Sequence, residues 1–338
     1  MKYLLNNHSI ILIQGTDMPV IENSTYKAPL FFGNNHVQTV LPTLFRKVKG
    51  VNYVRERIDT PDGDFIDIDI SSVNSDRAII LSHGLEGDSG RHYMKGMIRA
   101  FNRRGWDGVA FNFRGCSGES NRTSVTYHSG KTEDLHTVVE YLIKTRKYKS
   151  VALAGFSLGA NLTLKYAGER GKNILPQIKC AVGISAPCDL VSSSVEIHKP
   201  KNYIYSKRFL VTLVEKMRMK EKLHSDGITR NYSSIKTLGD FDNAFTAPLN
   251  GFRDAMDYWE RNSSRRYIAN TAIPTLILNA KDDPILGPGC FPYEEAERNS
   301  SLFLEVTEKG GHMGFITFGC NGEFWHETRV AEFAERCL

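Results

Sequence analysis

Short, wholly apolar runs recur along most of this chain and are separated by longer amphipathic stretches. The apolar runs lie at Ala78–Leu81, Gly108–Phe111, Val151–Ala154, Ala181–Ile184 and Thr275–Leu278. The stretches with helical periodicity lie at Tyr93–Arg104, Thr132–Arg146, Leu158–Glu169 and Glu323–Glu335. Strands that are apolar throughout are buried on both faces, and a helix between two strands lets them run parallel. The sequence therefore predicts an α/β fold with a doubly wound, mostly parallel sheet.

Two segments depart from this alternation. Tyr53–Ile58 and Phe65–Ser71 alternate apolar and polar residues on either side of Pro61-Asp62-Gly63, which predicts an N-terminal antiparallel hairpin. Between residues 188 and 270 a basic helical stretch, a polar loop and a second helical stretch replace the alternation. An insertion of this size usually forms a cap over the carboxyl edge of the sheet, where ligands bind. We expect an N-terminal arm packed on the core (1–50), an α/β core (51–187 and 271–338) and a helical cap insertion (188–270).

Composition excludes several classes of protein. With 41% hydrophobic and 24% charged residues among 338, the chain is not disordered, coiled-coil or collagen-like. Its apolar runs are shorter than the roughly 18 residues of a membrane span, and no signal-peptide cleavage site is apparent. The six scattered cysteines have no metal-type spacing, which indicates free thiols in a reducing, cytoplasmic compartment. The net charge of +5 lacks the dense basic stripe typical of nucleic-acid binders.

A serine lies where one apolar run gives way to a helical stretch. The string Gly155-Phe156-Ser157-Leu158-Gly159 directly follows Val151–Ala154 and directly precedes a helix. A G-x-S-x-G nucleophile elbow requires this strand–turn–helix context. Glycines allow the close backbone approach of a sharp turn, and the helix N-terminus favours negative charge on the serine oxygen. We therefore predict that Ser157 is a catalytic nucleophile.

A serine nucleophile needs a base and an orienting carboxylate, which follow it in the order acid, then histidine, on folds of this kind. Asp282 and Asp283 lie at the end of the run Thr275–Leu278. We choose Asp283, which borders Pro284, as the acid, and Asp282 remains the alternative. His312 lies in the glycine-rich loop after the last expected strand, Ser301–Val306, and is predicted to be the base.

The charge that forms on the substrate carbonyl oxygen needs backbone N–H donors. One is expected from Leu158, the residue after the nucleophile, and the other from Leu85 in the loop His83-Gly84-Leu85-Glu86-Gly87. For His83 we prefer a structural role as a hydrogen-bonding residue beneath the site.

Several longer strings make the chain recognisable. They are Asn35-His36-Val37-Gln38-Thr39, His83-Gly84-Leu85-Glu86-Gly87, Asn112-Phe113-Arg114-Gly115-Cys116-Ser117-Gly118-Glu119, Tyr127-His128-Ser129-Gly130 and Gly251-Phe252-Arg253-Asp254-Ala255. With the elbow, acid and histidine, they resemble the α/β-hydrolase superfamily, and within it the YheT-like branch with the ABHD1/ABHD3-type hydrolases. The resemblance runs from about residue 28 to the C-terminus. It implies an esterase or lipase with a serine triad and no cofactor or metal, and it leaves residues 1–17 as an extension without a functional role.

We therefore predict a serine carboxylesterase that hydrolyses small-molecule esters of short- to medium-chain acids through an acyl-enzyme. A lipid-directed lipase, phospholipase or acylglycerol hydrolase is the alternative, and an acyltransferase would use the same acyl-enzyme. A catalytically silent binding protein on this fold is a further, less favoured reading. The oligomeric state cannot be read from the sequence.

One stretch of the expected cap is strongly basic. From Glu196 to Lys236 there are ten Lys or Arg against four Asp or Glu. Within Lys207–Leu223 the apolar side chains share one helical face, and the basic ones, including Lys216, Lys220 and Lys222, occupy much of the remainder. Such a helix can lie on an anionic membrane surface. We favour the simpler interpretation, a lid whose apolar face covers the site while its lysines are solvated.

Overall fold

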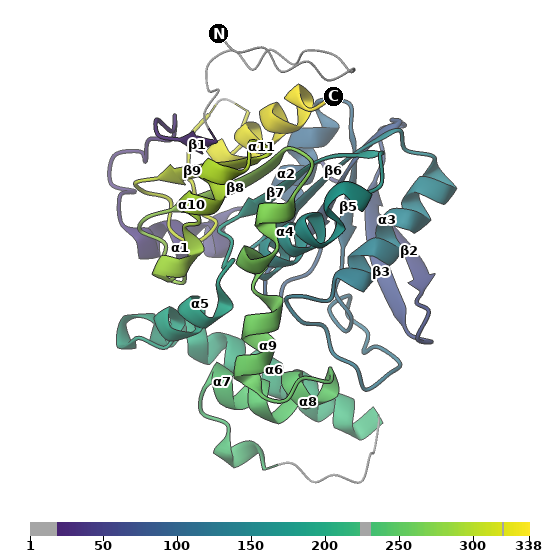
Figure 1. Cartoon of the computed structure of the whole chain (residues 1–338), viewed down its shortest axis with the longest axis vertical. Coiled ribbons are helices and arrows are strands. Elements are labelled where there is room, and N and C mark those ends of the chain that lie inside the picture. Colours follow the sequence, from purple (N-terminus) through teal and green to yellow (C-terminus); the bar gives the residue numbers. More distant parts are fainter. Residues whose placement is uncertain (1–18, 224–230, 320) are drawn as a thin grey trace.

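The computed structural model describes residues 19–223, 231–319 and 321–338 (Figure 1). In these ranges nine strands form one sheet in the order β1-β9-β8-β7-β6-β4-β5-β3-β2. The strands are β1 (Val20–Ile21), β2 (Val54–Asp59), β3 (Phe65–Ser71), β4 (Arg77–Ser82), β5 (Asp107–Phe111), β6 (Ser150–Phe156), β7 (Ile178–Ile184), β8 (Thr275–Ala280) and β9 (Leu302–Thr307). β3 runs antiparallel to both β2 and β5, and the other neighbours are parallel. The predicted mostly parallel sheet with an N-terminal hairpin is confirmed.

Helices cover both faces of the sheet (Figure 1). They are α1 (Asn35–Phe45), α2 (His92–Asn102), α3 (Thr132–Arg146), α4 (Leu158–Arg170), α5 (Leu190–Ile197), α6 (Tyr203–Leu223), α7 (Leu238–Phe241), α8 (Ala247–Leu249), α9 (Ala255–Asn262), α10 (Tyr293–Arg298) and α11 (Trp325–Arg336). One apolar core joins α2 and α11 to the sheet, through residues such as Met97 and Val330. A second core joins α3 and α4 to the sheet, through residues such as Val139 and Leu162. Because the central strands such as β5, β6 and β7 are buried on both faces, their sequences are mainly apolar.

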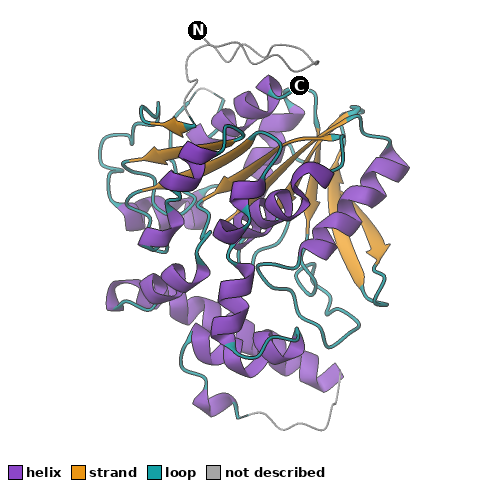
Figure 2. Cartoon of the chain, viewed as in Figure 1, coloured by secondary structure: helices purple, strands orange, loops and turns teal. Residues whose placement is uncertain are grey.

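The segment expected to form a cap, residues 188–270, lies between β7 and β8. Figure 2 shows its described part as helices and loops that project from one end of the sheet. Its helices enclose a small apolar cluster of their own that includes Leu213, Met217 and Phe245. The Asn202 side-chain amide donates to the Pro284 carbonyl oxygen at 2.5 Å, which ties this segment to the loop after β8.

Some expectations lie outside the described residues: the extension of residues 1–17, residues 224–230 of the basic stretch, and Cys320. The cysteines in the described ranges, Cys116, Cys180, Cys188, Cys290 and Cys337, are free thiols. No helix in the described part of the chain is both long and apolar enough to span a bilayer.

Candidate active site

Ser157 lies between the end of β6 and the start of α4, in a strained backbone conformation. Its φ of 53° is in the left-handed region, which non-glycine residues rarely adopt. A Cβ atom at Gly155 would overlap the carbonyl group of Gly159, and a Cβ at Gly159 would overlap the carbonyl oxygen of Ser82. The turn is therefore possible only with glycine at both positions. Its geometry is that of the predicted nucleophile elbow.

The structure brings Ser157, His312 and Asp283 into one hydrogen-bonded chain. His312 Nε2 lies 2.9 Å from Ser157 Oγ, and His312 Nδ1 lies 2.8 Å from Asp283 Oδ2. With the imidazole proton on Nδ1, the ring donates to the carboxylate and accepts from the serine hydroxyl. The His312 and Asp283 side chains are buried, so their interaction is shielded from solvent. These are the distances that a nucleophile, its base and an orienting acid require.

The choice of Asp283 over Asp282 agrees with this geometry. Asp282 Oδ1 accepts from the Gly311 N–H at 3.0 Å and does not reach the imidazole. Burial raises the pKa of Asp282 above its ordinary value. Asp282 therefore supports the backbone of the histidine loop, while its neighbour contacts the ring.

The two backbone segments expected to supply oxyanion donors lie next to Ser157. Leu158 is the first residue of α4, and the first N–H groups of a helix have no acceptor within it. The loop after β4 passes close to the nucleophile: a Cβ at Gly84 would lie 3.3 Å from Ser157 Cβ. Leu85 follows Gly84 in this loop, so both predicted donors lie beside Ser157.

His83 lies in this loop as a buried, neutral side chain. Its Nε2 accepts from the Phe113 N–H at 3.1 Å, and its Nδ1 lies 2.7 Å from the Gly84 carbonyl oxygen. Burial lowers the pKa of His83 to about 3. Both ring nitrogens are thus engaged with backbone, as the preferred structural role requires.

Three residues of α1 hold the two loops that carry His312 and Asp283. Thr39 Oγ1 accepts from the His312 N–H at 2.9 Å, and the fully buried Gln38 accepts through Oε1 from the Ile316 N–H at 3.0 Å. Asn35 donates to the Asp282 carbonyl oxygen at 2.8 Å. In the sequence this string indicates only a family resemblance and predicts no role for these three residues. Its signal was a cluster of polar residues, Asn35, Gln38 and Thr39, in an expected arm.

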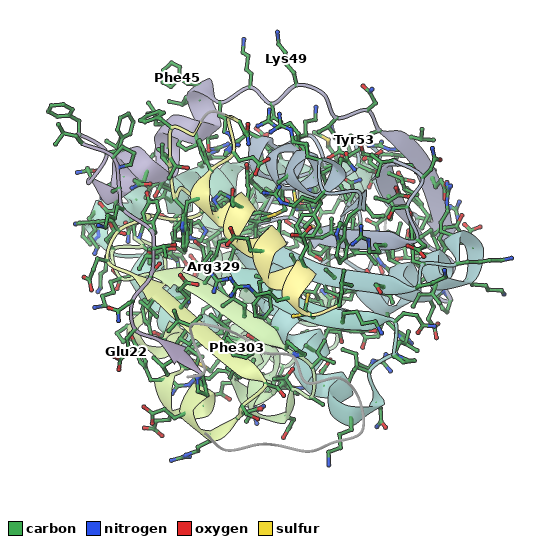
Figure 3. All side chains as sticks on the ribbon, turned by 90° about the horizontal axis from the view of Figure 1, so that it is seen from above. Glu22, Phe45, Lys49, Tyr53, Phe303 and Arg329 are labelled. Atoms are coloured by element: carbon green, nitrogen blue, oxygen red, sulfur yellow. The ribbon has the colours of Figure 1, made fainter. Side chains whose placement is uncertain are left out.

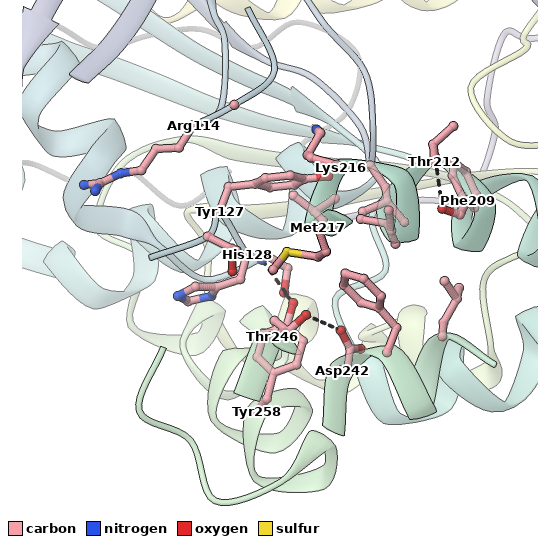
Figure 4. A pocket seen from close by; sticks show the side chains of 18 of the residues that line it. Arg114, Tyr127, His128, Phe209, Thr212, Lys216, Met217, Asp242, Thr246 and Tyr258 are labelled. Carbon is pink, nitrogen blue, oxygen red and sulfur yellow. Dashed lines mark hydrogen bonds between the residues drawn. The ribbon is translucent and has the colours of Figure 1, made fainter. Parts of the chain in front are cut away.

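The structure corrects the expected position of two cap lysines. Lys216 and Lys220 are not on the solvated side of α6: they point into the molecule beside the active site (Figure 4 shows Lys216). Lys216 Nζ donates to Glu86 Oε1 at 2.7 Å and lies 3.1 Å from Cys116 Sγ. Lys220 Nζ donates to the Val125 carbonyl oxygen at 2.7 Å, and burial lowers its pKa to about 8. Their long aliphatic stems pass through the apolar face, so helical periodicity did not place them inside.

A cavity of about 410 Å³ is lined by Ser157 and by side chains of the inserted segment 188–270, part of which Figure 4 shows. Its apolar lining includes Leu85, Leu158, Leu190, Ile197, Phe209, Leu213, Met217, Phe241, Trp259 and Ile285. Asp242 is a half-buried residue in this wall, where it accepts from Thr246 Oγ1 at 2.6 Å and from Trp259 Nε1 at 2.8 Å. Burial raises the pKa of Asp242 to about 6. The volume and mainly apolar lining are typical of a pocket for a small organic ligand.

Comparison with known proteins decides the family. The model of the alpha/beta hydrolase fold family matches residues 77–318, a range that contains every predicted site residue. The chain belongs to the α/β-hydrolase fold family. The resemblance inferred from the sequence strings is thereby confirmed.

This α/β hydrolase is similar to YheT of Escherichia coli (strain K12), which carries an esterase name. The two are 34% identical over 311 residues, which are 89% of this chain and 90% of that protein. Phospholipase ABHD3 of Mus musculus is 30% identical over 313 residues, 88% of this chain and 74% of that protein. Among solved structures, an esterase of Pyrococcus furiosus covers 85% of this chain and 91% of its own, with a TM-score of 0.58 and 22% identity. The YheT-like relationship is confirmed by the first two proteins, and the fold by the third.

The described residues of this α/β hydrolase contain no group of three or more His, Cys, Asp or Glu side chains placed to hold a metal ion. The expectation that the enzyme needs no metal or cofactor stays a prediction.

Proposed function

We propose that this α/β hydrolase is a serine carboxylesterase in which Ser157, His312 and Asp283 form the catalytic triad. The observation that carries the proposal is the hydrogen-bonded chain from Ser157 Oγ through His312 to Asp283, at the foot of an apolar cavity. The elbow geometry and the esterase and phospholipase names of similar proteins support it. The free thiols in the described chain support a reducing compartment such as the cytoplasm.

The reaction follows from the hydrogen-bond directions. Ser157 Oγ attacks the ester carbonyl carbon while its proton moves to His312 Nε2, and Asp283 stabilises the imidazolium. The N–H groups of Leu158 and Leu85 donate to the oxyanion of the tetrahedral intermediate. His312 returns the proton to the departing alcohol, which leaves an acyl group on Ser157. Water, deprotonated by the same imidazole, then releases the acid and restores the serine.

The cavity supports small-molecule esters with a short- to medium-length acyl chain. Its volume of about 410 Å³ is near the lower end of the roughly 300–1,000 Å³ found for ligand pockets. Apolar side chains such as Leu213, Met217 and Phe241 would contact the acyl chain, and their burial of its methylene groups would favour binding.

A lipid ester is the second candidate substrate. Two observations favour it: similarity to a phospholipase, and apolar side chains exposed on the outer side of α6, among them Ile204 at 77% and Met219 at 62%. Basic side chains on the same helix, Lys207 and Lys222, are also exposed. Transfer of the acyl group to an alcohol in place of water would use the same acyl-enzyme.

A fluorophosphonate probe tests the nucleophile. We expect stoichiometric labelling of the wild-type protein, with the adduct located on Ser157 by mass spectrometry, and no labelling of Ser157→Ala. Because that variant loses a triad member, its turnover of p-nitrophenyl esters should fall by several orders of magnitude. A folded Ser157→Ala protein that keeps about a tenth of the wild-type activity would refute the assignment of the nucleophile.

A panel of p-nitrophenyl esters with increasing acyl length, measured beside phospholipid and monoacylglycerol, separates the two substrate classes. The cavity predicts that kcat/KM rises with chain length and then falls when the chain exceeds the space beneath the cap. A preference for the lipids over every soluble ester would reverse the order of the two candidates.

A further inference from the structure

The helix α1 has its polar and apolar sides reversed relative to an ordinary surface helix. Its buried residues are Gln38 and Pro42. Its exposed side chains include Leu44 at 65% and Phe45 at 70%. A surface helix of a globular protein normally turns its apolar stripe toward the core. Here the inner side is occupied by the polar contacts to the His312 loop, and the apolar side faces outward.

Neighbouring segments extend this apolar surface. Leu30 is 80% exposed and Phe31 is 88% exposed in the loop before α1, and Phe318 is 71% exposed. The Phe318 ring contacts the Phe32 ring edge-on, with centroids 5.1 Å apart, so the loop after His312 adjoins the arm. We call the following exposed set the arm face: Leu30, Phe31, Val37, Val40, Leu44, Phe45 and Phe318. A group of exposed apolar side chains on neighbouring segments usually marks a place of contact with a partner or membrane.

The segment that carries most of the arm face has charged residues of one sign. Residues 23–54 contain four Lys or Arg and no Asp or Glu. Lys27, Lys47 and Lys49 are exposed, whereas Arg46 is engaged in an ion pair with the buried Glu327 at 2.6 Å. Figure 3 places Phe45 and Lys49 along the same rim of the molecule. Large apolar side chains in a segment whose charged residues are all basic are complementary to a lipid surface with anionic head groups.

We propose that the arm face docks this hydrolase onto an anionic lipid surface. A second copy of the chain fits the charges less well. In a symmetric dimer the same patch meets itself, which would bring the lysines of one copy near those of the other. This docking goes beyond the proposed ester hydrolysis, since binding to lipid does not require turnover.

Docking through α1 would place the active site close to the lipid. The same helix contacts the lipid with its outer side and the His312 loop with its inner side, through Thr39 and Gln38. A helix with its side chains is only about 10–12 Å across. The catalytic loop would therefore lie about one helix diameter from the surface. This consequence, unlike the docking itself, rests on the proposed function.

Flotation of the full-length protein with vesicles tests the docking. Vesicles of phosphatidylcholine alone are compared with vesicles that also contain phosphatidylserine. We expect binding to the anionic vesicles that weakens as salt screens the charges. Lys47→Gln with Lys49→Gln should weaken it roughly 25-fold, at about fivefold per lysine. Leu44→Ser with Phe45→Ser should weaken it by at least about tenfold, through loss of buried apolar area.

Matched variants distinguish the arm face from general effects. Lys144 and Lys172 are exposed lysines outside the arm, the first on α3 at the opposite side of Figure 1, and their joint replacement by Gln removes the same charge. The exposed Val54 on β2, changed to Ser, controls for loss of an apolar side chain. These controls should bind like wild type, and all variants should keep wild-type turnover of a soluble short-chain ester.

Three outcomes would overturn the proposal. One is equal binding to neutral and anionic vesicles. Another is a loss of binding that follows Lys207→Gln with Arg208→Gln on α6 and not the arm variants. The third is a wild-type dimer in sedimentation that Leu44→Ser with Phe45→Ser dissociates without changing vesicle binding. Because the Ser157→Ala protein should still bind vesicles, failure of the proposed catalytic function would be seen separately.

Discussion

A contact between the cap and the loop after β4 predicts that Lys216 acts on the oxyanion donors. Glu86 follows Leu85 and has a φ of 53°, a conformation that its surroundings must hold. Its N–H donates to the Tyr127 hydroxyl at 3.1 Å, and that hydroxyl donates to Glu86 Oε1 at 2.6 Å. Lys216 donates to the same carboxylate oxygen at 2.7 Å from across the cavity. A side chain of the cap thus fixes the residue next to a proposed oxyanion donor.

Replacing Lys216 by Met removes the cation but keeps an unbranched side chain that is only one atom shorter. The Glu86 carboxylate, whose side chain is only 9% exposed, would then lack its ion-pair partner. A buried carboxylate without its partner draws in water or changes conformation, which would move the Leu85 N–H away from the oxyanion. Complete loss of one oxyanion donor costs about 100- to 1,000-fold in kcat. Since the donor is displaced and not deleted, we expect kcat to fall by roughly tenfold to a hundredfold, below that limit.

Steady-state kinetics on a soluble short-chain ester measure this effect. The loss should appear in kcat more than in KM, because the broken contact acts on the Leu85 N–H, and Lys216→Arg should retain most of kcat. On a Glu86→Gln background, Lys216→Met should have a much smaller effect, since the two residues act through one contact. The exposed Lys222 on the same helix, changed to Met, is the matched control. If Lys216→Met lowers the thermal stability or raises KM but leaves kcat at the wild-type value, the reasoning is wrong.

Three further predictions concern other parts of the site. Asp283→Asn should lower kcat by about 10⁴, because asparagine favours the wrong imidazole tautomer, while Asp282→Asn should cost far less; similar losses in both variants would contradict the assignment. Thr39→Val leaves the His312 N–H without its acceptor. Because a lost buried hydrogen bond costs about 1–3 kcal/mol, kcat should fall by about tenfold, whereas Thr39→Ser keeps the hydroxyl and should keep kcat near the wild-type value. The pKa of Asp242 is raised from 3.8 to about 6, so the folded state holds this proton more tightly than the unfolded state between these values. The free energy of unfolding should therefore fall as pH rises through this window, by on the order of 3 kcal/mol, and pH-dependent chemical denaturation of Asp242→Asn should lack that decrease.

The parallel core and the elbow could be predicted because each rests on a local pattern. A strand covered on both faces must be apolar at every position, so β6 and β8 are visible in the sequence. The string around Ser157 combines two glycines with a strand and a helix, and Asp283 and His312 follow strands at the same sheet edge. The order of these residues along the chain is then enough to predict that their three side chains meet.

The arm and the cap could not be predicted in the same way. β1 has only two residues, Val20–Ile21, too few to show a period. α1 buries Gln38 and exposes Leu44, so a rule that turns apolar residues inward gives the wrong orientation. Lys216 was assigned to the solvated side of its helix because its charge favours water, but its stem reaches Glu86 across the cavity. In each case a contact between distant segments overrides the local pattern.

The packing of the His312 loop on α1 also has a consequence for biosynthesis. The hydrogen bond between Thr39 and His312 joins residues 273 positions apart, and the ion pair between Arg46 and Glu327 joins residues 281 apart. A ribosome releases the first partner of each pair long before the second. The arm therefore lacks these two partners while the sheet is synthesised. Contacts between residues so far apart in sequence also form slowly. An incomplete nascent chain cannot carry out the proposed hydrolysis, so activity would begin only when synthesis is nearly finished.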